Sequence, residues 1–132
     1  MTDILTDELY TQILLDAVHQ PQHRGDMLEP DLTTTTGNAS CGDEVIVKIK
    51  LSTDKTSFKA VKWQGQGCII SQAHMDGMAA AVIGQKLLTV KTWGRPEVLA
   101  LFGLTNISSS REKCLMLGLK AIQQAISSSN TP

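Results

Sequence analysis

The sequence predicts an α+β domain in which helices pack on one face of a three-stranded antiparallel sheet. Two observations predict this class. Apolar and polar residues alternate between positions 45 and 64, and apolar residues recur at helical spacing before and after that stretch. The expected order of elements is α-β-β-β-α-α-α. Because 132 residues fit one domain of ordinary size, we take residues 1–132 as a single unit.

The first half of the chain predicts one helix and the whole sheet. Thr6 is a suitable N-cap for the helix, and Pro21 marks its end. The first strand is a run of four threonines, which favours a sheet edge, and the second alternates valine, isoleucine and leucine with lysine. The strands are expected at residues 33–36, 45–51 and 58–64, with a turn between the last two at residues 52–55.

Three helices are expected after the sheet. The first follows Cys68 and is ended by Gly84. The second is short, begins at Pro96 and ends before Gly103. The last begins with a capping box at residues 109–112, so its start is the best defined of the three.

Composition and charge exclude several functions. The net charge is −1 and aromatic residues make up only 4% of the chain, which argues against nucleic-acid binding. No stretch approaches the ~20 apolar residues that a membrane helix needs. The acidic start lacks the basic and apolar parts of a signal peptide, so we expect a cytoplasmic protein.

Three cysteines are the strongest candidates for chemistry. Cys41 lies in a run of turn-forming residues before a strand, Cys68 follows two glycines between a strand and a helix, and Cys114 falls in the second turn of the capped helix. In a reducing cytosol such thiols are more often reactive or metal-binding than paired in disulfides. The separations of 27 and 46 positions contain no C-x-x-C pair, so spacing alone does not identify a zinc finger.

Asp43 strengthens the metal interpretation. It follows Cys41 by two positions, and in an extended segment side chains two apart point the same way. Three thiolates and one carboxylate make a tetrahedral set that suits Zn²⁺. Taken by itself, Asp43 is better explained as a turn or cap residue.

Three motifs, each around a cysteine, resemble the U-type iron–sulfur cluster assembly proteins (IscU, SufU and the NifU N-terminal domain). A segment around Pro21 and Gly25 resembles that family's opening helix and loop, so the resemblance covers nearly the whole chain. The motifs are residues 38–43 (NASCGD), 65–73 (GQGCIISQA) and 111–114 (REKC).

The resemblance implies a function as well as a fold. Cys41, Asp43, Cys68 and Cys114 are expected to meet at one exposed end and to hold Zn²⁺ or a nascent [2Fe–2S] cluster. The protein is expected to act as a scaffold or sulfur acceptor rather than an enzyme. Its expected partners are a cysteine desulfurase, which supplies sulfur, and apo iron–sulfur proteins or downstream carriers. A homo-oligomer is compatible with the sequence, since a cluster can bridge two chains.

The branch of the family stays open. IscU-like scaffolds have a histidine immediately before the third cysteine and a chaperone-binding segment ahead of it, whereas this chain has Lys113 and residues 106–110 (NISSS). Lys113 favours a SufU-like, zinc-dependent sulfur acceptor, with Cys41 as the acceptor thiol. SufU-like proteins commonly carry an insertion between the second and third cysteines, and this interval is too short for it. Arg111 and Lys113 are expected either to favour the thiolates electrostatically or simply to be solvated.

Two other classes of function remain as alternatives. One is a cysteine-nucleophile enzyme, which needs a histidine partner, and the other is a structural zinc-binding interaction module. His19 and His23 are expected to be surface or capping groups, and His74, on the helix after Cys68, is expected to face solvent. Met75 and Met78 are expected to pack in the helix interface.

Overall fold

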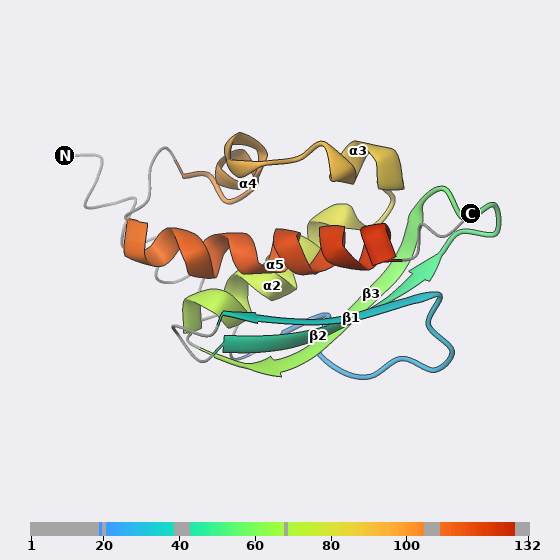
Figure 1. The fold of residues 1–132 in the computed structure, drawn as a ribbon, viewed down its shortest axis with the longest axis horizontal. Coiled ribbons are helices and arrows are strands. Elements are labelled where there is room, and N and C mark those ends of the chain that lie inside the picture. The colour runs from blue at the N-terminus through green and yellow to red at the C-terminus, as the bar shows by residue number, and fades with distance from the viewer. Residues whose placement is uncertain (1–18, 20, 39–42, 68, 105–108, 129–132) are drawn as a thin grey trace.

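The fold confirms the α+β prediction. The structure, a computed structural model, describes residues 19, 21–38, 43–67, 69–104 and 109–128 (Figure 1). The helix expected before Pro21 lies, except for His19, outside the described residues. Three strands are followed by helices, in the order β1 (Leu32–Asn38), β2 (Asp43–Leu51), β3 (Phe58–Gln66), α2 (Ile69–Val82), α3 (Leu87–Lys91), α4 (Arg95–Leu101) and α5 (Ser109–Ser128).

The sheet is an antiparallel meander with the strand order β1-β2-β3. Val47 of β2 lies opposite Thr34 of β1 and Trp63 of β3. Alternate residues of β2 are buried while Lys48 and Lys50 remain partly exposed, as a strand with one covered face requires. The four threonines belong to an edge strand, as predicted, because β1 pairs only with β2 within the described sheet.

The helices form two further layers on one side of the sheet. α2 and α5 lie directly against the strands, and α3 and α4 lie beyond them (Figure 1). The close approach of α2 to α5 depends on Gly118, because a Cβ there would lie 3.3 Å from the Met75 Cα atom. The layers therefore stack in the order sheet, α2 with α5, and α3 with α4.

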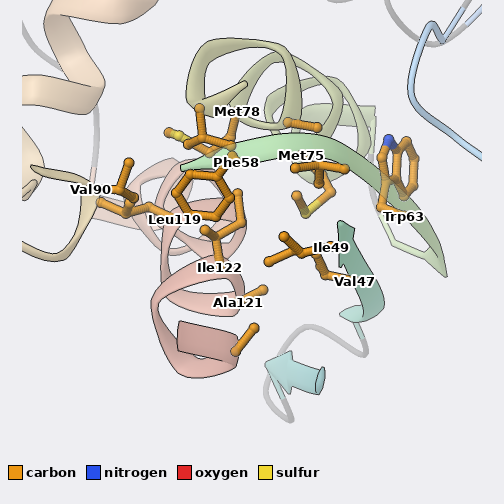
Figure 2. Close-up of a cluster of buried hydrophobic side chains, with 14 of the residues drawn as sticks. Val47, Ile49, Phe58, Trp63, Met75, Met78, Val90, Leu119, Ala121 and Ile122 are labelled. Carbon is orange, nitrogen blue, oxygen red and sulfur yellow. The ribbon is translucent and has the colours of Figure 1, made fainter. Parts of the chain in front are cut away.

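The hydrophobic core fills the space between the sheet and the two inner helices and extends to buried residues of α3 and α4 (Figure 2). Met75 and Met78 are fully buried in it, which confirms their predicted packing role. Each large apolar side chain removed from water in this way contributes roughly 1.5–3 kcal/mol. Facing them are Val47, Ile49, Phe58, Leu119 and Ile122, which come from the sheet and α5.

The short helix α3 is additional to the predicted elements. Its N-cap, Lys86, makes no side-chain capping hydrogen bond, so no start signal is present in the sequence. Tertiary contacts define it instead. The backbone N–H of Leu87 donates to the Thr56 carbonyl at 2.9 Å, next to the β2–β3 turn.

His74 contradicts the prediction of a solvent-facing side chain, because only 1% of it is exposed. Phe102, which follows α4, packs against this face of α2 with its ring centroid 4.3 Å from that of His74. Gly77 makes room for the same ring, since a Cβ at that position would lie 2.5 Å from it. The sequence does not reveal that α4 covers this face.

None of the helices within the described ranges is long and apolar enough to cross a membrane.

The burial of His74 predicts acid sensitivity. Burial lowers the pKa of His74 from 6.5 to about 4. Between these values the unfolded chain binds a proton that the folded chain does not, so the stability present above pH 6.5 falls as the pH drops towards 4. Urea titrations should show about 2 kcal/mol less stability at pH 5 than at pH 7 from this group. The variant His74→Leu should lose most of that difference, and an unchanged pH dependence in the variant would contradict the assignment.

Candidate metal and sulfur-transfer site

The segments that carry the predicted ligands converge at one end of the molecule. β1 ends and β2 begins there, because Asn38 is paired with Asp43. The end of β3 lies alongside, because Glu44 is paired with Gln66. Both α2 and α5 start at the same end of the fold, at the left of Figure 1.

A hollow marks the meeting point of these segments. It is bounded by Glu44 at the start of β2, by Gly65 at the end of β3, by Gln72 in the first turn of α2 and by Leu117 of α5. Leu117 lies one helical turn after Cys114. Four elements from three separate regions of the sequence therefore contribute to one small surface next to the predicted ligand positions.

The structure describes some of the predicted site residues fully, some only by their backbone and others not at all. Cys41 and Cys68 lie outside the described residues. Asp43 is the first residue of β2, and its backbone position is described but its side chain is not. In the parts of the chain that the structure describes, no group of three or more His, Cys, Asp or Glu side chains could hold a metal ion. The four proposed ligands thus remain a prediction at the level of side chains.

Cys114 is the one predicted ligand whose side chain is described. It lies in the second turn of α5 as a thiol, not in a disulfide, with 7% of the residue exposed. Its neighbour Lys113 is exposed, and Arg111 is described only as a backbone position in the first turn.

An ion pair with α4 also holds the first turn of α5. Glu112 accepts a hydrogen bond at 2.5 Å from the Nε atom of Arg95, which begins α4. The two side chains are about two-fifths exposed, so the pair contributes little free energy. It nevertheless ties the start of α4 to the turn that precedes Cys114.

The strand that leads to Cys68 needs its glycines. At Gly65 a Cβ would lie 2.2 Å from the Glu44 carbonyl oxygen, so only glycine permits this close approach of β3 to β2. Gly67 has φ = 156°, in the region that favours glycine. Glycine is therefore required at position 65 by strand pairing and at position 67 by the backbone conformation.

Sequence reasoning missed a buried carboxylate close to this strand. Asp76 of α2 is only 6% exposed. Its Oδ1 atom accepts hydrogen bonds from the Trp63 indole at 2.9 Å and from the backbone N–H of His23 at 2.8 Å. Its Oδ2 atom accepts one at 3.1 Å from the backbone N–H of Gln22. The signal that could have revealed it is a charged residue between the buried positions Met75 and Met78, because a buried carboxylate requires donors.

The segment that Asp76 holds also pairs with β3. Gly25 donates its N–H to the Trp63 carbonyl at 2.8 Å, and Trp63 donates to the His23 carbonyl at 3.0 Å. Arg24 forms a parallel bridge with Trp63 and places its guanidinium 5.1 Å from the centre of the indole ring. The outer edge of β3 is therefore covered at this point, and His23 acts here through its backbone.

Comparison with known families agrees with the motifs. A family model described as "NifU-like N terminal domain" matches residues 9–131. The chain is 25% identical to the iron–sulfur cluster assembly scaffold protein IscU of Thermotoga maritima, over 94% of this chain and 96% of that protein. It is 26% identical to the zinc-dependent sulfurtransferase SufU of Bacillus subtilis, over 91% of this chain and 90% of that protein.

Solved structures share the fold. The N-terminal part of a nitrogen-fixing NifU-like protein from Brucella abortus superposes with a TM-score of 0.71 at 21% identity, over 92% of this chain and 94% of that chain. The SUF-system protein FiSufU of Fervidobacterium islandicum gives 0.69 at 23% identity, over 86% and 93%.

The Asp76 contacts predict a large loss of stability when the charge is removed. In Asp76→Asn the amide keeps one acceptor oxygen and brings its NH₂ group towards N–H donors, so at least one buried hydrogen bond is lost. Urea unfolding should show a loss of about 2–4 kcal/mol. The control Asp54→Asn, in the exposed β2–β3 turn, should lose less than about 1 kcal/mol. Equal losses in the two variants would contradict the structural role of Asp76.

Proposed function

The chain belongs to the family of NifU-like N-terminal domains, and we propose that it acts in iron–sulfur cluster assembly. In this proposal it accepts sulfur from a cysteine desulfurase and holds a metal ion or a nascent [2Fe–2S] cluster for delivery to apo iron–sulfur proteins or carriers. The observation that carries the proposal is the convergence at one end of the fold of the start of β2, the end of β3 and the starts of α2 and α5. These ends flank every cysteine of the chain.

The ligand set proposed is Cys41, Asp43, Cys68 and Cys114. Thiolates are natural ligands of both zinc and iron, and three of them with one carboxylate complete a tetrahedron. The described neighbours fit such a group. Cys114 is shielded by the surrounding side chains but lies one turn from Leu117, which lines the hollow.

The sulfur-transfer step that we propose is thiol–disulfide exchange. The Cys41 thiolate attacks the outer sulfur of the persulfide on the desulfurase, the S–S bond breaks, and the desulfurase cysteine leaves as a thiolate. Cys41 then carries the persulfide, so no external oxidant or reductant is needed. When bound, the metal ion holds the thiols deprotonated, and the cations of Arg111 and Lys113 offset part of the negative charge.

Lys113 favours the zinc-dependent form of this function. It occupies the position where IscU-like scaffolds have histidine, and its side chain is exposed rather than packed. The relatives include both a scaffold and a zinc-dependent sulfurtransferase, so the two roles differ in whether a cluster is built on the protein or sulfur is passed through it. We propose a non-enzymatic sulfur acceptor. A cysteine-nucleophile enzyme has less support, because His74 is buried against Phe102.

The metal content of the purified protein tests this proposal. Protein prepared without oxygen should contain about one zinc ion per chain, or iron with a matching amount of acid-labile sulfide. The variant Cys41→Ser should lose most of it, because one of the four ligands is removed. Iron, zinc and sulfide are measured per chain for both proteins.

Each result has a distinct meaning. Iron with sulfide that is lost in Cys41→Ser supports the scaffold role, and zinc without sulfide supports the sulfur acceptor. Absence of all three from both proteins would contradict the proposed chemistry, although the family and fold would be unaffected.

The acceptor thiol is tested separately. After incubation with a cysteine desulfurase and cysteine, alkylation and peptide mass analysis should find the extra sulfur on Cys41. The same reaction with Cys41→Ser should leave the chain without a persulfide. Extra sulfur on Cys68 or Cys114 of the wild-type chain, with Cys41 unmodified, would refute the assignment of Cys41.

A further inference from the structure

We propose that Arg24 and Gln72 are positioning residues that hold the strand end before Cys68 in one conformation, and that the site binds metal tightly only while they do so. This inference rests on the proposed function, because it assigns these side chains a role in the site of Cys41, Asp43, Cys68 and Cys114. Neither side chain is among the motifs' candidate ligands.

The segment that needs holding is residues 65–67. Both Gly65 and Gly67 lack a side chain, and glycine loses more conformational freedom on ordering than any other residue. β3 ends at Gln66, so pairing with β2 no longer restrains the backbone beyond that residue. Gly65 cannot be replaced by a stiffer residue, because Glu44 approaches too closely. Beyond Gln66, restraint therefore has to come from side chains outside the strand.

Two hydrogen bonds supply this restraint. Arg24 donates from Nη2 to the Gly65 carbonyl at 3.1 Å, and Gln72 donates from Nε2 to the Gly67 carbonyl at 2.9 Å. The Gly67 carbonyl belongs to the planar peptide bond that leads into residue 68, so fixing this oxygen fixes the orientation of that peptide.

The two side chains also restrain each other. Arg24 donates from Nη1 to Oε1 of Gln72 at 3.2 Å, so the amide of Gln72 is used at both ends. The planar guanidinium presents two separate nitrogens at a fixed spacing to the Gly65 carbonyl and the Gln72 amide, whereas lysine offers a single nitrogen. Removing either side chain therefore weakens the hold of the other.

Arg24 is itself held in place through the buried residues Trp63 and Asp76. Its guanidinium lies over the Trp63 ring, its backbone runs beside Trp63, and Asp76 accepts hydrogen bonds from the preceding residues and from the indole. The chain of contacts runs from a buried carboxylate to an exposed cation and then to the strand end. Because Arg24 is exposed and Gln72 only partly buried, their truncation leaves the core intact.

The experiment compares zinc release from four variants of the full chain with that from the wild type. Zinc-loaded Gln72→Ala and Arg24→Ala should transfer zinc to an excess of a chromophoric chelator about tenfold faster than the wild type, with melting temperatures close to the wild-type value. Arg24→Lys should resemble Arg24→Ala, because lysine keeps the positive charge but lacks the planar guanidinium group with its separate donor nitrogens. Gln64→Ala, an exposed glutamine on the same strand, is the matched control and should release zinc at the wild-type rate.

Two results would overturn the inference. One is zinc release from Gln72→Ala no faster than from Gln64→Ala, and the other is full rescue by Arg24→Lys, which would indicate charge alone.

Hydrogen exchange of the metal-free chain separates this inference from the proposed function. Peptides that cover residues 65–68 should exchange faster in Gln72→Ala than in Gln64→Ala, whether or not zinc binds. If the wild type binds neither zinc nor iron with sulfide, the proposed function fails, and equal exchange rates in the two variants would then overturn the positioning role as well.

Discussion

The end of the fold that we assign to metal and sulfur depends on the burial of one carboxylate, that of Asp76. A charged group removed from water is tolerated only when donors replace the lost hydration, and here the indole of Trp63 and two backbone N–H groups do so. The donors belong to a strand and to a segment more than fifty positions away in sequence. The hydrogen bonds to this carboxylate therefore hold three parts of the chain together, and they fix the position of the backbone just before Arg24.

The layered fold follows largely from short-range patterns. Alternation at residues 45–51 defines a half-covered strand, and the capping box at residues 109–112 agrees with a long helix that begins at Ser109. Elements that lack such patterns were not predictable. α3 has no capping side chain and exists because its backbone bonds to the neighbouring turn, and His74 is buried because a helix distant in sequence supplies Phe102. Both depend on tertiary contacts that no local pattern encodes.

The candidate site was likewise predictable only in part from the sequence. Cysteine motifs predict the proposed ligands, because residue type and flanking glycines are local properties of the sequence. The roles of the residues that surround them are not indicated by the motifs, even for Gln72, which lies within residues 65–73. Gln72 is one polar residue in the first turn of a helix, and only the backbone of β3 beside it shows that both ends of its amide are used. Asp76 differs, because a charged residue inside an apolar stripe is a signal that sequence reasoning can use.

The meander topology has a consequence for the order in which parts of the protein fold during synthesis. β1, β2 and β3 are adjacent in sequence, so their contacts close short loops and can form early, whereas α5 joins them from the far end of the chain. During synthesis Cys41 and Cys68 leave the ribosome well before Cys114 does. A nascent chain therefore exposes an incomplete set of thiols until its last helix docks. Completion of the fold and completion of the proposed ligand set are then the same event.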